Sequence, residues 1–372
     1  MKTVLKYDYC GEFEEGLSAV CSNGKYGFID ECRNEVIPLI YDYVYDFCEG
    51  YATVCLDGKY GAIDKNNRVV IPIQYNGAQD FCDGLIAVLK ENKWCFLNEN
   101  GNKAIDQTFD DCQGFCDGIA AVKINKIWGY INKQGEIVIK PLFHDVYYNS
   151  ESKLIEVCIN DKWGYIDRNG NAVLPIMYDR VGSFSNTLCA VKLNKKWGYV
   201  DIDNKINIPF AYDGAIDFSN GIVGAKFKTR FDYIKSTNGL AGVKRNNRWG
   251  FIDILNNEVV PLQYDHISSF ENGLAMVSLD CKCGFIDTFG DIAIPIEYDF
   301  ALPFSEGYAA VKKGFKWGFI DKYGNEVVPL LYDYACEFHN GFARVMKDEK
   351  WGYIKRKTLK SLPTPNLCAS RQ

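Results

Sequence analysis

The residues of this chain best suited to metal binding or nucleophilic chemistry are its fifteen cysteines. Cys48, Cys82 and Cys116 follow one another at intervals of 34 residues, and His339 stands at the corresponding place far along the chain. A zinc site needs thiolates about 2.3 Å from one ion, and no two cysteines form a C-x-x-C pair. We therefore predict reduced, packed thiols, with no metal site and no bound cofactor.

General acid and base chemistry has little support in the sequence. The sequence has three histidines, and each stands at a different position of the repeat described below: His144, His266 and His339. Nucleophile-elbow, metalloprotease, phosphate-loop and dinucleotide-binding motifs are all missing from the sequence. Aspartate and glutamate are abundant, but turns and solvation explain them. We predict no catalytic residue and no enzymatic activity.

One segment alternates aromatic and basic side chains in the pattern of an amphipathic strand. It predicts an inserted strand near 223–240, and Ser-Thr-Asn-Gly after it indicates a hairpin. In one interpretation the segment docks an acidic protein partner through Lys226, Phe227, Lys228, Arg230, Phe231 and Tyr233. In the other it is a partial duplication that covers a sheet edge, because GIVGAK (221–226) resembles GLAGVK (239–244) at an offset of 18 residues.

Composition excludes several classes of protein. The formal charge of the chain is −6. Residues 355–372 contain five basic residues and no acidic one, so the first 354 residues carry a charge of −11. We expect no binding to nucleic acid from so acidic a body. No apolar run approaches the roughly 18 residues of a membrane span, and the first residues lack the apolar core of a signal peptide. We expect a cytoplasmic protein that does not bind membranes.

The candidate residues discussed above belong to a chain built from a repeated sequence element that occurs ten times. Counting from the residue before a recurrent glycine, the intervals are 34 or 35 residues, except for one of 52. The ten positions are Tyr26, Tyr60, Trp94, Trp128, Trp163, Trp197, Trp249, Cys283, Trp317 and Trp351. Such regular spacing indicates stacked units that each bury a face against the next one.

Each repeat predicts three short strands. The first contains a valine six residues before the recurrent position in all ten copies, which suits a buried pleated surface. The second is the WGYID segment, apolar on both faces and therefore central. Asp and Gly three residues apart, as at Asp167 and Gly170, predict a tight turn after it. A proline then places the third strand at a sheet edge, because proline cannot donate to a β-ladder.

The fold class that follows is all-β. We predict a tandem array of about ten 34-residue, three-stranded antiparallel units over residues 1–363, with a short flexible tail at 364–372. An open curved or superhelical solenoid is preferred, since charged residues such as Lys6 and Lys355 suit the two exposed ends. One or two β-propellers are the alternative. The seven tryptophans are expected to be structural residues between units: Trp94, Trp128, Trp163, Trp197, Trp249, Trp317 and Trp351.

The segments KWGYVD (196–201), RWGFID (248–253) and KWGFID (316–321) make the chain resemble the bacterial WG-repeat family over about residues 1–363. The resemblance implies β-rich repeats that mediate interactions, and no catalytic residue. We expect a non-enzymatic scaffold that binds a protein partner. The alternative is a glycan-binding module that uses exposed tyrosine and phenylalanine rings, because the chain has 24 tyrosines and 23 phenylalanines.

Overall fold

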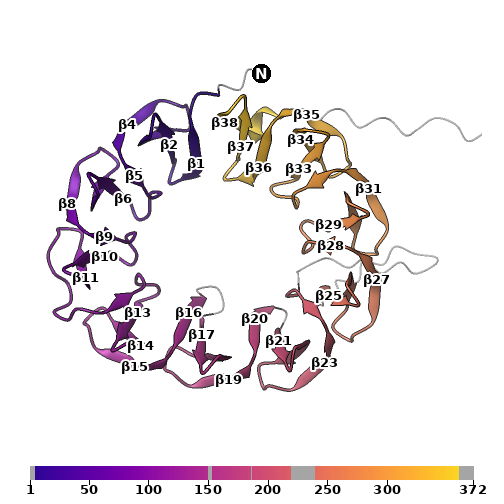
Figure 1. Cartoon of the computed structure of the whole chain (residues 1–372), viewed down its shortest axis with the longest axis horizontal. Helices are drawn as coiled ribbons and strands as arrows, with labels where there is room; N and C mark the ends of the chain where they lie inside the picture. The colour runs from indigo at the N-terminus through magenta and orange to yellow at the C-terminus, as the bar shows by residue number, and fades with distance from the viewer. Residues whose placement is uncertain (1–4, 150–152, 186, 219–238, 360–372) are drawn as a thin grey trace, which may run out of the picture. The chain divides into compact units, whose positions relative to one another are not determined.

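The computed structural model describes residues 5–149, 153–185, 187–218 and 239–359. The chain divides into two compact units, an N-terminal unit of Tyr7–Asp217 and a C-terminal unit made of Met1–Lys6 and Phe218–Gln372. Ten small antiparallel sheets form these units, which confirms the all-β prediction (Figure 1). Within the described residues, no helix has the length and hydrophobicity of a transmembrane span.

The N-terminal unit contains six sheets and ends with one further short strand. Its strands are β1 (Tyr9–Glu14), β2 (Leu17–Ser22), β3 (Lys25–Asp30) and β4 (Glu35–Tyr41); β5 (Tyr43–Val44), β6 (Tyr51–Leu56), β7 (Lys59–Asp64) and β8 (Val69–Tyr75); β9 (Gly77–Ala78), β10 (Leu85–Lys90) and β11 (Lys93–Asn98); β12 (Asp111–Cys112), β13 (Ile119–Ile124), β14 (Ile127–Asn132) and β15 (Ile137–Phe143); β16 (Asp145–Asn149), β17 (Leu154–Ile159), β18 (Lys162–Ile166) and β19 (Ala172–Tyr178); β20 (Arg180–Ser185), β21 (Leu188–Leu193), β22 (Lys196–Asp201) and β23 (Ile206–Tyr212); and finally β24 (Gly214–Ala215).

The C-terminal unit repeats the same pattern. Its elements are β25 (Ala241–Arg245), β26 (Arg248–Ile252) and β27 (Glu258–Tyr264); β28 (His266–Ile267), β29 (Leu274–Leu279), β30 (Lys282–Asp287) and β31 (Ile292–Tyr298); β32 (Phe300–Ala301), β33 (Tyr308–Lys313), β34 (Lys316–Asp321) and β35 (Glu326–Tyr332); β36 (Tyr334–His339), β37 (Phe342–Lys347) and β38 (Lys350–Lys355); and the 3-10 helix η1 (Arg356–Thr358).

Most sheets have four strands, one more than the repeat predicts. In the sheet β5-β6-β7-β8 the extra strand is β5, only two residues long, which pairs antiparallel with β6. This first strand comes from the end of the preceding sequence repeat, directly after its Tyr-Asp pair. Four-stranded antiparallel sheets of this form are the blades of β-propellers. The sheets therefore correspond to the predicted alternative, a β-propeller, and not to the preferred open solenoid.

The edge of the last sheet also differs from the prediction. The backbone N–H of Lys6 donates to the carbonyl of Trp351 at 3.1 Å, and Leu5 packs against the core that this sheet shares with its neighbour. Residues 5 and 6 therefore lie beside β38 within the C-terminal unit. The expected N-terminal cap of an open array is wrong in this respect.

The recurrent valine and glycine are cross-strand partners. Val20 lies opposite Gly27, and Val311 lies opposite Gly318, and all ten valines are at most 1% exposed. A Cβ on Gly318 would meet the carbonyl oxygen of Val328 at 2.4 Å, because the fourth strand passes directly over it. The glycine is therefore required by the close approach of the outer strand.

The single exception supports this explanation. Cys95 replaces the glycine in the third repeat, and there the outer strand is lost: the sheet is β11-β10-β9, and only isolated bridges join β11 to the following residues. In each described sheet that has an outer strand, the proline lies on that strand, next to a shift in the pairing register, as at Pro38 between Ile37 and Tyr41. The predicted edge position of proline is confirmed.

The hydrophobic cores lie between consecutive sheets. One core joins Phe28, Ile37 and Tyr41 of the first sheet to Phe47 and Val54 of the second, and seven further clusters are built in the same way. Phe28 and Phe47 meet edge to face, with ring centroids 4.8 Å apart. Equivalent ring pairs recur at Phe96–Phe115, Tyr165–Phe184, Phe251–Phe270, Phe285–Phe304 and Phe319–Phe338. Neighbouring sheets thus bury each other's faces, as the repeat predicted.

Regular ionic contacts also join consecutive sheets. Asp42 accepts from the Lys25 ammonium of the first sheet at 2.6 Å and from the backbone N–H of Asp57, in a hairpin of the second sheet, at 2.6 Å. The hydrogen bond from Lys25 holds the pKa of Asp42 below its ordinary value. The same ion pair recurs at Lys93–Asp110, Lys162–Asp179, Lys196–Asp213, Arg248–Asp265, Lys282–Asp299 and Lys316–Asp333. Most of the conspicuous Tyr-Asp carboxylates are therefore structural.

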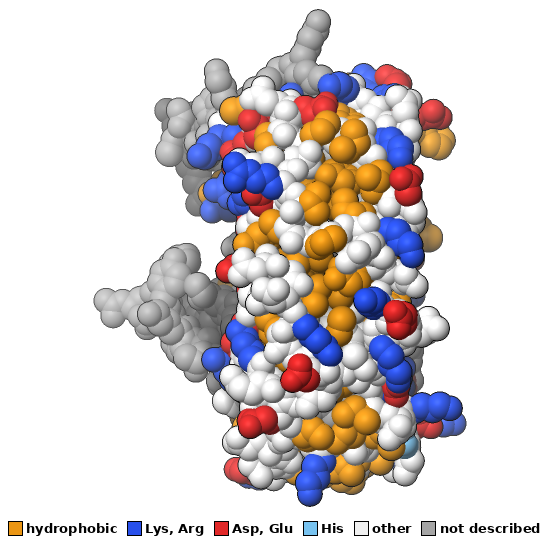
Figure 2. All heavy atoms as spheres, turned by 90° about the vertical axis from the view of Figure 1, so that its left-hand side faces the viewer, with side chains coloured by type: hydrophobic (Ala, Val, Ile, Leu, Met, Phe, Trp, Pro, Cys, Tyr) orange, Lys and Arg blue, Asp and Glu red, His pale blue; other side chains and the backbone are white. Residues whose placement is uncertain are grey.

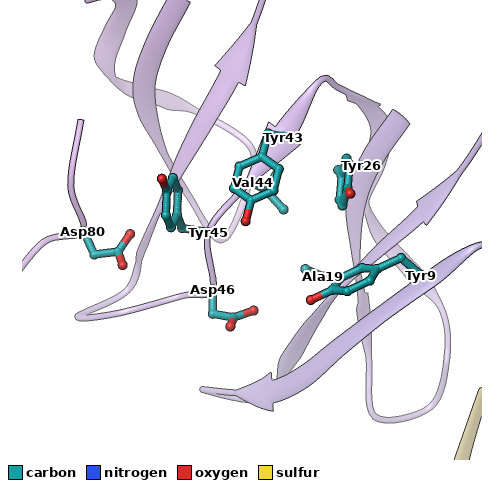
Figure 3. A pocket seen from close by; sticks show the side chains of 8 residues that line it. All are labelled: Tyr9, Ala19, Tyr26, Tyr43, Val44, Tyr45, Asp46 and Asp80. Atoms are coloured by element: carbon teal, nitrogen blue, oxygen red, sulfur yellow. The ribbon is translucent and has the colours of Figure 1, made fainter. Parts of the chain in front are cut away.

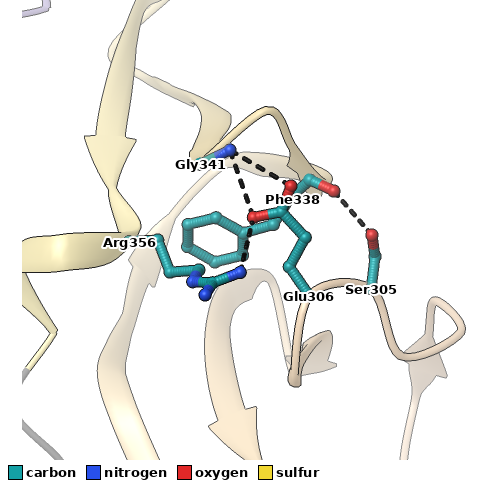
Figure 4. A network of polar contacts seen from close by, with 5 residues as sticks. All are labelled: Ser305, Glu306, Phe338, Gly341 and Arg356. Carbon is teal, nitrogen blue, oxygen red and sulfur yellow. Dashed lines mark hydrogen bonds and ion pairs between the residues drawn. The ribbon is translucent and has the colours of Figure 1, made fainter. Parts of the chain in front are cut away.

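A second set of contacts joins the hairpins at the opposite end of the first strands. In Figure 4, Glu306 accepts from the backbone N–H of Gly341 in the next sheet at 3.1 Å and pairs with Arg356 at 3.2 Å. Ser305 donates to the carbonyl oxygen of Phe338 at 2.6 Å. Glu15 and Glu49 make the equivalent bonds to the next hairpin in the N-terminal unit. These contacts fix the register between sheets.

Candidate binding site

A small pocket lies beside the short first strands of the first two sheets of the N-terminal unit. Its volume is about 150 Å³. The lining side chains are Tyr9, Ala19, Tyr26, Tyr43, Val44, Tyr45, Asp46 and Asp80 (Figure 3). Four tyrosine rings and two carboxylates thus surround a space large enough for a group of a few heavy atoms.

The four rings form a continuous series. Ring centroids are 5.9 Å apart for Tyr9 and Tyr26, 5.5 Å for Tyr26 and Tyr43, and 5.2 Å for Tyr43 and Tyr45. The last pair is edge to face at 84°. Tyr9, Tyr43 and Tyr45 are 42%, 45% and 38% exposed, so the rings remain open to a ligand. Figure 3 shows Tyr45 between Asp80 and Tyr43.

The strand pairing explains why these rings meet. Tyr9 on β1 and Tyr26 on β3 both pair with Cys21 on β2, so they project from one face of the first sheet. Tyr43 and Tyr45 flank the buried Val44 in the second sheet and therefore share the opposite side of that segment. Two neighbouring sheets consequently supply two rings each.

Asp80 has an unusual environment. The backbone before it is fixed, because the hydroxyl of Thr53 donates to the carbonyl of Gln79 at 2.8 Å. Oδ1 of Asp80 is buried, and no hydrogen-bond partner for it is found within the described part of the chain. Burial raises the pKa of Asp80 to about 6, with a hydrogen bond from the Thr53 side chain opposing the shift and the charge of the exposed Asp46 adding to it. The carboxylate would therefore gain from a positive charge beside it.

The lining has no basic residue, so its electrostatics favour a cation. Aromatic faces attract cations within about 6 Å of the ring centroid. A cation would also offset the cost of burying the negative charge of Asp80. Rings and carboxylates together suit a small positively charged group.

A second surface feature of the N-terminal unit lies on the outer strands. Many side chains of these strands are exposed and apolar, and they form what we term the outer apolar band: Val36, Ile40, Val69, Ile137, Val138, Leu142, Met177 and Ile206. Figure 2 shows apolar side chains running along this face of the molecule. Extended exposed apolar surface of this kind marks protein-binding sites.

The cysteines of the repeated hairpin position are not activated. Burial raises the pKa of Cys48 and Cys116, and it raises the pKa of Cys82 to about 11. A thiol with a raised pKa has little thiolate at neutral pH and is a poor nucleophile. No disulfide joins the described cysteines.

The positions of the sequence-predicted site residues are mixed. Lys226, Phe227, Lys228, Arg230, Phe231 and Tyr233, with the inserted strand near 223–240, lie outside the described residues. The tail at 364–372 also lies outside them. Of the tryptophans, Trp128 and Trp317 are buried, whereas Trp94, Trp163, Trp197, Trp249 and Trp351 are half-buried at the margin of the cores. The ring two residues further on, such as Phe319, occupies the centre.

The tyrosine pocket was not predicted from the sequence. A local signal was present: residues 41–46, YDYVYD, contain three tyrosines and two aspartates. Tyr26 was also one of the departures from tryptophan at the recurrent position. These signals point to a site only when Tyr9 and Asp80, 71 residues apart, are known to meet.

Comparisons with known proteins identify the family of the chain. A crystal structure of the eukaryotic initiation factor matches with a TM-score of 0.45 and 11% identity, covering 80% of this chain and 89% of that one. Hsv2 of Kluyveromyces lactis matches with a TM-score of 0.36 and 11% identity, covering 72% of this chain and 93% of that one. No curated protein matches the sequence.

The model of the WG containing repeat matches almost the whole chain. It matches residues 5–26, 26–60, 60–94, 96–126, 128–163, 163–197, 197–228, 249–283, 284–317 and 317–351. These ten segments follow the recurrent positions found in the sequence and the ten sheets of the structure. The chain belongs to the WG-repeat family.

Proposed function

We propose that this protein is a non-enzymatic scaffold that binds a protein partner through the outer apolar band. The observation that carries the proposal is the series of exposed apolar side chains on the outer strands β4, β8, β15, β19 and β23. These side chains cost solubility, and the sheet cores are complete without them. Covering them with a partner would favour binding by about 25 cal/mol for each Å² of apolar surface removed from water.

The chemistry of the repeated polar residues agrees with a non-enzymatic function. The Tyr-Asp carboxylates are held as anions by lysine, as the lowered pKa values of Asp42, Asp110 and Asp179 indicate. Acid and base catalysts instead need pKa values near the working pH. The thiols have raised pKa values, which opposes nucleophilic chemistry.

Glycan binding is not favoured. That alternative relies on exposed rings in the Tyr-Asp positions, and those rings are mostly packed. Tyr41, Tyr178, Tyr212 and Tyr264 are at most 3% exposed. Tyr41 also donates its hydroxyl to Asn67 of the next sheet, so its ring and its polar atom both serve the fold.

Site-specific photo-crosslinking in the native cell tests the proposal. A crosslinking amino acid at Leu142 of the band should capture one discrete protein, and the same group at Phe315, an apolar residue exposed on a hairpin turn, should not. Replacing Ile40 and Val69 with lysine should abolish capture at Leu142, and these exposed positions should tolerate the change. Equal capture at Leu142 and Phe315, or capture unaffected by the lysines, would contradict the proposal.

A further inference from the structure

We propose that the tyrosine pocket binds an alkylated ammonium group, either an N-methylated lysine side chain or a small free quaternary ammonium compound. The pocket and the outer apolar band involve opposite edges of the sheets, since one adjoins the first strands and the other covers the fourth strands. The inference therefore goes beyond the scaffold function and does not depend on it.

The size of the pocket limits the ligand group. Its volume of about 150 Å³ is similar to that of a cavity that holds benzene. Sites for drug-sized molecules have volumes of about 300–1,000 Å³. A trimethylammonium group fits the smaller volume, while its stem or the remainder of the ligand extends into solvent past the exposed rings of Tyr43 and Tyr45.

The rings select for a cation with an apolar surface. Four tyrosines in one series offer electron-rich faces, and quaternary ammonium groups are recognised by aromatic cages of this composition. A primary ammonium group carries three N–H donors that must replace their water. Four of the eight lining residues are tyrosines, and their rings offer no hydrogen-bond acceptor to replace the water of a primary ammonium group, so an alkylated ammonium loses less hydration there than a primary one.

The carboxylates set the sign of the charge. Asp80 contributes a buried oxygen, Oδ1, that has no hydrogen-bond partner among the described residues, and Asp46 adds a second carboxylate at the exposed side. An anionic ligand would face both charges, and a neutral ligand would leave Asp80 uncompensated. A cation placed against Tyr45, which lies next to Asp80 in Figure 3, would relieve that cost.

The repeat supplies a matched control for this geometry. Tyr334 occupies the same repeat position as Tyr43 and is 44% exposed, close to the 45% of Tyr43. Its ring also lies between two aromatic rings, Trp317 and Trp351, each 5.7 Å away. At the place of Tyr45, however, this repeat has Cys336.

Calorimetric titration of the full chain with tetramethylammonium chloride tests the inference. We expect saturable binding, at least tenfold tighter than binding of ammonium chloride at the same ionic strength. Tyr43→Ala and Asp80→Asn should each weaken binding by tenfold or more, and Tyr334→Ala should leave it unchanged. Equal affinity for the two cations, or equal effects of Tyr43→Ala and Tyr334→Ala, would overturn the proposal.

A second titration distinguishes the two sources of the group. Peptides that differ only in lysine or trimethyllysine are compared with choline. A trimethyllysine peptide that binds tenfold tighter than choline assigns the site to a modified protein, and tighter binding of choline assigns it to a free metabolite. An unmodified peptide that binds as well as its trimethylated form would refute the inference. Loss of the photo-crosslinked partner alone would affect the scaffold function and not this site.

Discussion

Replacing Asp80 with asparagine should stabilise the N-terminal unit at neutral pH. Burial raises the pKa of Asp80 from an ordinary value of 3.8 to about 6. That difference corresponds to about 3 kcal/mol at 1.36 kcal/mol per pKa unit. Because the side chain is only partly buried, solvent screening reduces the expected effect to about 1–2 kcal/mol. The free energy of unfolding should rise by this amount in the variant at pH 7.5.

The pH dependence of this difference follows from linkage. The pKa is higher in the folded state, so the folded protein binds more protons than the unfolded protein between about pH 4 and pH 6. The wild type therefore loses stability as the pH rises through this window, and the loss is complete above it. Asparagine does not titrate, so the advantage of the variant should be full at pH 7.5 and small near pH 4.

Thermal unfolding of the full chain at pH 4.5, 6.0 and 7.5 measures this difference. For a unit of about 200 residues, 1–2 kcal/mol corresponds to a rise in Tm of about 2–8 °C. Asp217→Asn is the matched control: Asp217 holds the same repeat position and its pKa is also raised by burial, but it accepts the backbone N–H of Ser183 at 3.0 Å. A lower Tm for Asp80→Asn at pH 7.5, or a difference that does not vary with pH, would refute the reasoning.

Three further predictions concern the repeat itself. Gly129→Ala should cost about 1–3 kcal/mol in urea unfolding, because its Cβ would meet an outer-strand carbonyl oxygen at 2.6 Å; a cost below 0.5 kcal/mol would contradict this. Ile127→Lys with His144→Asp should restore the missing ion pair, so the double variant should have a higher Tm than either single variant; additive effects would exclude coupling. Phe251→Ala should cost about 3–5 kcal/mol and Trp249→Ala clearly less, since Phe251 is fully buried and Trp249 is half-buried; the reverse order would place the main packing on tryptophan.

The fold class was predictable because the repeat imposes strict local requirements. Valine opposite glycine, Asp before the turn at Gly170, and proline on an edge strand are each consequences of backbone geometry. Asp167, for example, accepts the backbone N–H groups of both Asn169 and Asn171. Ten copies of the same requirements make the pattern unambiguous.

The extra strand at the first edge of each sheet could not be predicted in the same way. A strand of two residues, such as β5 or β9, is too short to show an alternating pattern. It also pairs with the strand that follows it in the next sequence repeat, so the sequence repeat and the sheet are out of phase. The pocket depends on these short strands, which is why it was not anticipated.

The tryptophans show a different limit of sequence analysis. The sequence predicts tryptophans that are structural residues between units, and it does not indicate that rings two residues later, such as Phe319, lie deeper than most of them. Trp317 and Phe319 lie on the same strand face, and the edge-to-face partner of Phe319 in the next sheet is Phe338. Depth within a core depends on the strand pairing across sheets, which the one-dimensional pattern does not contain.

Some residues that depart from the repeat are accompanied by a second change that removes their cost to the fold. Such residues are explained by packing, whereas a departure without a second change suggests a binding function. Cys95 coincides with loss of the strand that glycine would accommodate. His144 coincides with Ile127, and its Nδ1 still accepts the N–H of Asn160 at 3.0 Å. Beside Cys95 there is no outer strand that would require glycine. At His144 the lysine of the ion pair is also missing, and the hairpin N–H still has an acceptor.

Asp80 is compensated less completely: a hydrogen bond from the Thr53 side chain lowers its pKa, but burial outweighs it, and Oδ1 has no hydrogen-bond partner among the described residues. Asn or Ser at this position would keep the sheet contacts without burying a charge, yet a carboxylate with an unpaired oxygen is present beside four tyrosines. A carboxylate that is buried at a cost in stability and lines a pocket is a candidate for a binding site. The cost is removed when a cation occupies the pocket, so ligand binding and the pKa of Asp80 must be linked: the bound cation should lower that pKa and release a proton near pH 6. Titrations in buffers of different ionisation enthalpy would detect this release at pH 6 and its absence in Asp80→Asn; binding at pH 6 without proton release would show that the carboxylate and the ligand do not interact.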